Sequence, residues 1–184
     1  MSVPDTPFWV YSLTTYGRED VAAGCLALQD RFGLDVNLFL LCCWLGSRGT
    51  ALDQPQADRA VTVAKEWADP VIEPLRTVRR HLKPITADEQ IVKLRKQLAA
   101  LELDAEKIQQ SRLYELFGTL PSDPEAALLQ ATIKNLTHYL AAIAQPLEPP
   151  LRETLVKLLT AVFPDEPEVD IVSSLAVSAT DPTI

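Results

Sequence analysis

Apolar residues in this chain recur at intervals of three and four positions and do not alternate with polar ones. That spacing is the period of an amphipathic α-helix, and it continues along most of the sequence. Proline and glycine interrupt it repeatedly, which marks the expected helix ends. The pattern predicts an all-α protein, a compact multi-helix bundle, with helices over residues 7–16, 18–32, 36–45, 54–68, 71–83, 86–116, 125–144 and 151–163.

Several helix ends have a local signal. Thr6-Pro7 has the form of an N-cap followed by proline at the first helical position. Asp35 can cap the helix that follows it, and residues 86–89 read as a capping box for the long helix over about 86–116. Asp69-Pro70 is expected to separate two helices.

The same pattern predicts which faces are buried. Residues 36–45 are apolar on nearly all sides, so they should form the most buried helix. The helices over 125–144 and 151–163 are expected to pair as a C-terminal hairpin with an exposed seam. Two more apolar sets are expected to be buried or to form a seam, namely Phe8, Trp9, Leu13 and Tyr16 in the first helix, and Leu94, Leu98, Leu101, Ala105 and Ile108 in the long one.

Three regions are expected along the chain. Residues 1–120 form a helical bundle domain, and residues 121–163 form the helical hairpin extension. Residues 164–184 are acidic and rich in Ser and Thr, without a sustained apolar period, so they are expected to be a mobile or docked tail.

Charge changes this picture in one region. The 184 residues contain 17 Lys and Arg against 25 Asp and Glu, a formal net charge of -8, which argues against a broad nucleic-acid surface. Residues 76–112 are locally basic, with nine basic and five acidic side chains. The net charge therefore disfavours nucleic-acid binding as a general property, and a local basic stripe stays open as an alternative.

Cysteine usage and apolar run length bear on the compartment. Cys25, Cys42 and Cys43 are an odd set in apolar runs, which disfavours a disulfide framework and fits a reducing cytoplasm. The N-terminus does not resemble a secretory signal. The longest apolar run, residues 38–45, is far shorter than the roughly 20 residues that cross a bilayer. We expect a cytoplasmic protein without membrane insertion.

The search for catalytic and ligand-binding motifs mainly gives exclusions. The sequence has neither of the glycine-rich phosphate-binding motifs, no aspartate cluster for magnesium, and only two histidines, far apart. Cys42 and Cys43 lie in the most apolar helix, where a thiol behaves as a small hydrophobe. We therefore expect no cofactor, no metal site and no catalytic residue.

One set of polar residues stands out. Acidic and amide side chains lead directly into the most apolar helix, and arginines at helical spacing share a face of residues 71–83. A buried carboxylate needs a partner, and arginine is the usual one, so we expect Asp30 and Asp35 to meet one or two of these arginines. The candidate ligand-binding residues are Asp30, Asp35, Asn37, Trp44, Arg76, Arg79 and Arg80.

Two interpretations of this cluster stay open. It is either a buried salt-bridge network that fixes helix packing, or an anion pocket for a phosphate or carboxylate ligand, bordered by Trp9, Tyr16 and Trp44. A second basic group in residues 93–96 is a solvated helix face or part of a stripe for RNA or an acidic partner.

Several of these segments together resemble an uncharacterised family of small proteobacterial proteins, a domain of unknown function. The resemblance covers roughly residues 8–113 and implies no activity, cofactor or catalytic residue. Residues from about 116 onward lie outside it. The segments that carry the resemblance are Phe8-Trp9, residues 25–30, residues 33–37, Trp44-Leu45, Trp67, Pro74-Leu75-Arg76 and residues 79–83.

The function is unknown from sequence, and three hypotheses follow. The first is a non-enzymatic cytoplasmic helical interaction or adaptor protein, with a protein partner or a homo-oligomer built on the long helix or the hairpin. The second is a protein or enzyme that binds an anionic small molecule through the Asp/Asn-Arg cluster. The third is an RNA- or ribosome-associated protein acting through residues 76–96.

Overall fold

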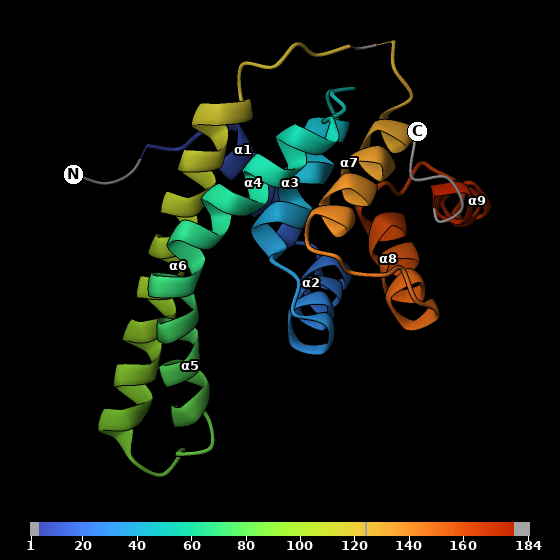
Figure 1. Cartoon of the computed structure of the whole chain (residues 1–184). Coiled ribbons are helices and arrows are strands. Elements are labelled where there is room, and N and C mark those ends of the chain that lie inside the picture. The colour runs from blue at the N-terminus through green and yellow to red at the C-terminus, as the bar shows by residue number, and fades with distance from the viewer. Residues whose placement is uncertain (1–3, 124, 179–184) are drawn as a thin grey trace.

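A computed structural model of the chain describes residues 4–123 and 125–178. All regular structure in these ranges is helical, as Figure 1 shows, so the predicted all-α class with one long helix is confirmed. The elements are α1 Pro7–Tyr16, α2 Glu19–Phe32, α3 Val36–Gly46, α4 Gln54–Trp67, the π-helical turn η1 Ala68–Ile72, α5 Glu73–Leu82, α6 Glu89–Phe117, α7 Leu128–Ala142, α8 Pro149–Val162 and α9 Glu168–Ser178.

The predicted caps are partly confirmed. Thr6 caps α1 by accepting the backbone N–H of Trp9 at 3.1 Å, and Asp35 caps α3. The capping box at residues 86–89 is wrong, because Asp88 caps α6 instead and accepts two backbone N–H groups of its first turn. A short carboxylate immediately before the helix caps on its own, so the helix begins at Glu89.

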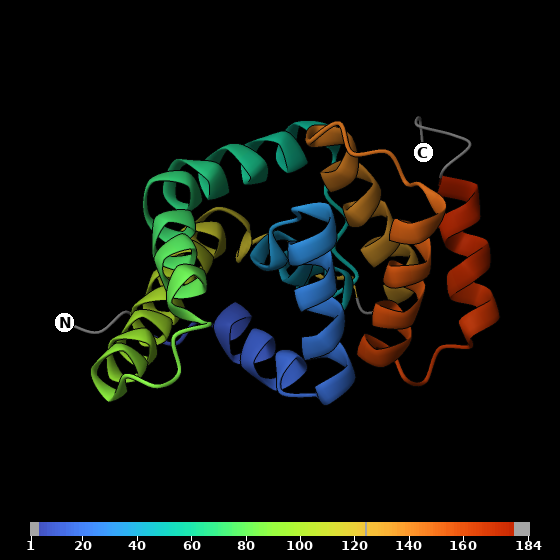
Figure 2. The ribbon, with the colours of Figure 1, turned by 90° about the horizontal axis from the view of Figure 1, so that it is seen from below.

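The predicted break at Asp69-Pro70 is also wrong. Here α4 continues through η1 into α5, and Figure 2 shows the three as one curved run. Proline lacks the N–H that an α-helical turn needs, and a single π-helical turn shifts the hydrogen-bond register without ending the helix. The curve carries α5 away from the central helices and along α6.

The core lies around α3, whose residues from Asn37 to Gly46 are all buried. At Gly46 the backbone of α7 comes so close that a Cβ would lie 2.6 Å from the Cα of Thr132, so only glycine fits there. The seam of the predicted hairpin is therefore not exposed: α7 packs on α3 and α4, and α8 packs on α2. Apolar residues beyond the family resemblance complete the same core as those within it.

The C-terminal segment docks as far as it is described. Within it α9 packs on α7 and α8 and buries Ile171 and Leu175. Residues 179–184 of the predicted tail lie outside the described residues. The proposed boundaries at residues 120 and 163 stay predictions, and one hydrophobic cluster spans both.

The N-terminal half of α6 is built differently. Figure 1 shows α5 and this N-terminal half of α6 side by side, extending beyond the other helices, and we call these two segments the arm. The predicted leucine seam is wrong here, because Leu94 and Leu101 are about half exposed and only Ala105 of that set is buried. An arm of two helices has too few neighbours to cover a leucine stripe. The buried face of α6 instead contains Glu102, Ala105, Gln109, Gln110, Leu113 and Phe117.

Candidate functional site

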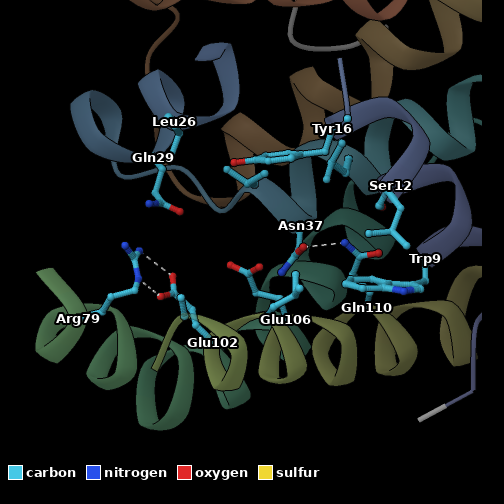
Figure 3. A pocket seen from close by; sticks show the side chains of 16 residues that line it. Trp9, Ser12, Tyr16, Leu26, Gln29, Asn37, Arg79, Glu102, Glu106 and Gln110 are labelled. Carbon is cyan, nitrogen blue, oxygen red and sulfur yellow. Dashed lines mark hydrogen bonds and ion pairs between the residues drawn. The ribbon is translucent and has the colours of Figure 1, made fainter. Parts of the chain in front are cut away.

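A cavity of about 510 Å³ opens where α1, α2, α5 and α6 meet the start of α3 (Figure 3). Its volume suits a small organic molecule. One part of the wall is apolar and another is polar. The apolar part includes Trp9, Leu13, Leu26, Val36, Leu40 and Leu103, and the polar part includes Ser12, Tyr16, Gln29, Asn37, Arg79, Glu102, Glu106 and Gln110.

Helical spacing places the polar wall. Glu102, Glu106 and Gln110 follow one another at four-residue intervals, so they line one face of α6. On the opposite side, Ser12 and Tyr16 repeat the same interval on α1. The predicted burial of Tyr16 and Leu13 is wrong, since both are exposed at the cavity.

A cluster of buried amides forms the floor. The Asn37 side chain donates to the Oε1 of Gln109 and accepts from the Nε2 of Gln110 at 2.7 Å. Gln109 in turn donates to Asp35 Oδ2 at 2.8 Å and to the backbone carbonyl of Ala64 at 3.1 Å. These bonds fix the orientation of each amide and tie α3 and α4 to α6.

The expected partner of Asp35 is wrong. Its carboxylate accepts from the backbone N–H groups of Asn37 and Leu38 and from Gln109, and no described arginine pairs with it. Burial raises the pKa of Asp35, and these three hydrogen bonds oppose the rise. Two backbone N–H groups of its own helix and the Gln109 amide satisfy this N-cap carboxylate, so it needs no distant cation.

The arginines pair mainly with glutamates of α6. Arg76 binds Glu73 at 2.6 Å, Glu102 at 2.9 Å and Glu106 at 3.0 Å, and Arg79 also binds Glu102. Sequence reasoning missed Glu102 and Glu106. Their four-residue spacing, on the helix that follows the arginines directly, was the available signal.

Only one of the expected pairs forms. Arg80 binds Asp30, which confirms that pairing, but both side chains are about half exposed, so it is a surface link between α5 and α2. Trp44 lies in the core, where it stacks on Phe8 at a ring separation of 5.2 Å. It does not line the cavity, whereas Arg79 and Asn37 do. Ligand binding by the seven predicted residues stays a prediction.

Two buried polar atoms in the cavity wall have no partner. Ser12 Oγ and Gln110 Oε1 accept or donate no hydrogen bond among the described residues, although Ser12 is 3% and Gln110 is 2% exposed. Such an atom costs roughly 1–3 kcal/mol unless something satisfies it. Arg152 Nε on α8 is the other buried side-chain atom of this kind in the described ranges. Two of the three buried side-chain atoms without a partner in the described residues therefore belong to residues of the cavity wall.

Glu106 is the unusual carboxyl of the wall. Burial raises its pKa to about 7, while Arg76 opposes the rise and the charges of Glu102 and Asp35 add to it. Burial also acts on Glu102, but hydrogen bonds from Arg79 and Arg76 hold its pKa below the usual range. Glu102 thus stays ionised in its salt bridges near neutral pH, whereas Glu106 can change its charge there.

Metal and thiol chemistry have little support in the described residues. Across residues 4–123 and 125–178, no group of three or more His, Cys, Asp or Glu side chains is arranged to hold a metal ion. Burial raises the pKa of Cys25 to about 12 and that of Cys42 and Cys43 further, so these thiols are poor nucleophiles.

Comparisons with known proteins give one match. Residues 7–113 match a family described as a protein of unknown function, DUF2390. No curated protein and no solved structure matches the chain. Within the described residues, no helix combines the length and the apolar character that a membrane span requires.

Proposed function

The chain belongs to this family of unknown function, and we propose from its geometry that it binds a small amphipathic molecule in the cavity between α1, α2, α5 and α6. One observation carries the proposal. Ser12 and Gln110 both line the cavity, and each has one buried polar atom, Ser12 Oγ and Gln110 Oε1, without a hydrogen-bond partner among the described residues. A bound molecule with a hydrogen-bonding group would satisfy both atoms.

The shape of the cavity supports the proposal. Small-molecule sites are mostly apolar, of about 300–1,000 Å³, with a few polar groups that orient the ligand. This cavity has that composition, with Trp9, Leu26 and Leu103 available to the apolar body of a ligand and Gln110 available to its polar end. In the described residues no metal-binding group accompanies the cavity and no base is hydrogen-bonded to Ser12 Oγ, so we propose binding and no reaction.

The charges argue against an anionic ligand. Arg76 is bound by three glutamates and Arg79 by one, so a phosphate or carboxylate would have to displace a carboxylate that is already in place. The anion pocket stays a prediction, and this pairing makes it the weaker hypothesis. A neutral or cationic polar end fits the wall better.

The proposal is tested by blocking the cavity. Leu13 and Val10 lie on α1 and are both 52% exposed, but only Leu13 lines the cavity. Leu13→Trp should fill the space, and Val10→Trp is the matched control that places the same new side chain on α1 outside the cavity. A library of amphipathic metabolites is screened by melting temperature in the wild type and both variants, and by fluorescence with Trp9 as the reporter in a W44F/W67F protein that carries neither added tryptophan.

A ligand that stabilises the wild type and V10W but not L13W supports the cavity as its site. Ligands that bind both variants equally place the site elsewhere. If no member of the library shifts the melting temperature or the Trp9 emission, the cavity is not a binding site for this class.

A second candidate function is self-association through the arm. Leu94 and Leu101 are seven residues apart on one face of α6 and are exposed in the described structure, as a helix-pairing stripe would be. Light scattering at micromolar concentration tests this, with the double variant L94K/L101K as the form that should stay monomeric. A wild-type monomer would remove this candidate, including the predicted homo-oligomer.

Other proposals from sequence have narrower support. A protein partner in place of a second copy would use the same arm. Residues 76–96 are a weaker RNA surface than their composition indicates, because Arg76, Arg79 and Arg80 already pair with carboxylates. The buried unpaired cysteines support a reducing bacterial cytoplasm as the compartment.

A further inference from the structure

Both helices of the arm carry an apolar stripe at the alternating three- and four-residue spacing of a helix bundle. The α6 stripe contains Leu94, Leu98, Leu101, Ala105 and Ile108, and the α5 stripe, which begins in η1, contains Val71, Leu75, Val78 and Leu82. Resting on the self-association proposed above, we propose that two copies of the chain join their arms into a four-helix bundle. In it α5 supplies half of the interface, and the arms run antiparallel, with their tips (residues 83–88) at opposite ends.

The two stripes lie on the same side of the arm. At its base, Ala105 of α6 packs with Val71 and Leu75 in a small hydrophobic cluster that is separate from the main core. Arg76, which binds glutamates of α6, is two residues from Val78, so the two side chains point to opposite sides of α5. The ion pairs and the apolar stripes therefore occupy opposite sides of the arm, as they do in a hairpin that forms half of a four-helix bundle.

The stripes continue beyond this small cluster toward the tip without being covered. Val78, Leu94 and Leu101 are each about half exposed, and Leu82 and Leu98 are partly buried. This part of the arm extends beyond the other helices (Figure 1). The uncovered surface is thus continuous with a core that begins inside one chain, and a second pair of helices with the same spacing would complete it.

The edge of the α6 stripe suits contact with its own copy. Gln90, Gln97 and Asp104 follow one another at seven-residue intervals beside the stripe, and Lys93 lies between the two glutamines on the same face. All four side chains are exposed. In a two-fold dimer this edge meets the same edge of the other copy, so a row of like charges would repel. Glutamine amides can instead donate to and accept from one another.

The two charges at this edge favour antiparallel arms. Lys93 lies toward the tip and Asp104 toward the base, and neither has an ion-pair partner among the described residues. They lie almost equally far from Leu98 on either side. A two-fold axis at Leu98 therefore brings Lys93 of each copy opposite Asp104 of the other. With the tips together, α6 would face α5 of the other copy, whose exposed edge offers Thr77 and no carboxylate.

The dimer dissociates on dilution. Below its dissociation constant the chain is a monomer, and Leu94 and Leu101 are then exposed as they are in this structure.

The first test places a charge on the α5 stripe. Sedimentation equilibrium between about 1 and 200 μM protein measures the dissociation constant of the dimer. Val78→Lys is the variant, and Thr77→Lys is the matched control, with the same new side chain at a neighbouring exposed position outside the stripe. Because both positions are exposed in the monomer, both variants should fold, which circular dichroism checks. Val78→Lys should raise the dissociation constant at least about tenfold, and Thr77→Lys by less than about threefold.

The second test concerns the direction of the arms. Asp104→Lys should raise the dissociation constant by about three- to tenfold, because it places two lysines opposite each other. Combining Lys93→Asp with Asp104→Lys exchanges the two charges and should return the dissociation constant to within about threefold of the wild-type value.

The outcomes separate this dimer from self-association in general. A wild-type chain that is monomeric at about 200 μM removes both. A dimer that L94K/L101K dissociates and V78K does not would keep self-association but overturn the four-helix bundle, because α5 would then lie outside the interface. If exchanging the charges of Lys93 and Asp104 restores nothing, the antiparallel arrangement is wrong. The cavity takes no part in these measurements, so the metabolite screen tests ligand binding independently.

Discussion

Two helix pairs in this protein are held together by opposite means. Between α3 and α7 the contact is apolar and close, with a glycine at the point of nearest approach. Between α5 and α6 it depends on Arg76 and Arg79 with the glutamates of α6, while leucines of the same helix face solvent. The difference follows from the number of neighbours, because α3 is surrounded by other helices and the arm is not.

Polar groups also play different parts in the two regions. In the core, Asn135 of α7 is fully buried and binds the backbone N–H of Leu52 and the carbonyls of Cys42 and Thr50, so every polar atom it meets is satisfied. Near the arm, Ser12 and Gln110 keep unsatisfied atoms next to a cavity. The polar side chain in the core thus has protein partners for its atoms, whereas two polar atoms without partners belong to residues that line the cavity.

The largest expected effect concerns the ion pairs at the base of the arm. Arg76→Met should lower the free energy of unfolding by about 3–5 kcal/mol, because it leaves Glu102 and Glu106 buried with less compensation. Urea unfolding followed by circular dichroism measures this. Arg80→Met is the control, since its pair with Asp30 is half exposed and should contribute less than about 1 kcal/mol. Equal losses in both variants would remove the distinction between buried and surface pairs.

The next largest effect concerns the apolar contact between α3 and α7. Leu45→Ala should lower the free energy of unfolding by about 3 kcal/mol, since Leu45 is fully buried in α3 and its truncation leaves a cavity in the core. The same urea titration applies, with Val10→Ala as the exposed control. A loss below about 1 kcal/mol would mean that the core repacks easily and is not the rigid region described here.

A smaller effect appears with pH. Because the pKa of Glu106 is raised to about 7 on folding, the native state holds its proton more tightly than the unfolded chain. Stability should therefore be greatest below the ordinary glutamate pKa and fall as pH rises toward 7, by about 2–3 kcal/mol between pH 5 and 7.5. The raised pKa of Asp35 acts in the same direction.

Glu106→Gln isolates this term. The variant cannot ionise at this position, so its stability in urea titrations should change less over pH 5 to 7.5 than that of the wild type. Parallel curves for the two proteins would show that Glu106 does not titrate in this range. The lowered pKa of Glu102 acts at lower pH, where its contribution is lost on acidification.

The smallest effect belongs to the exposed face of the arm. Leu101→Ala should change the free energy of unfolding by no more than about 0.5 kcal/mol, because the side chain is half exposed. The measurement is the same urea titration, repeated at two protein concentrations. A larger loss that grows with concentration would mean that this leucine is covered in an assembly.

Local features were predictable where a few adjacent residues decide them. Thr6 and Asp35 cap their helices as expected, Gly33 takes the left-handed conformation that ends α2, and the apolar run of α3 is the buried helix. Each of these depends on backbone conformation within one turn or on the composition of one segment. No knowledge of the neighbouring helices is needed for them.

Partner choice was predictable only in part. The arginines do meet carboxylates, as expected. Asp35 was the wrong partner, because its carboxylate already accepts backbone N–H groups of the helix that it caps, and Glu102 was not considered. Spacing along a helix shows which side chains share a face. It does not show which other helix covers that face.

What the sequence alone determined, then, is the helical class, most helix ends and the identity of the most buried helix, because these follow from the spacing of apolar residues and from local hydrogen bonds. The tertiary structure decided which stripe of α6 is buried, where α7 and α8 pack, and that Ser12 and Gln110 face one cavity. These depend on how many neighbours each helix has, a property of the whole arrangement that no single segment encodes.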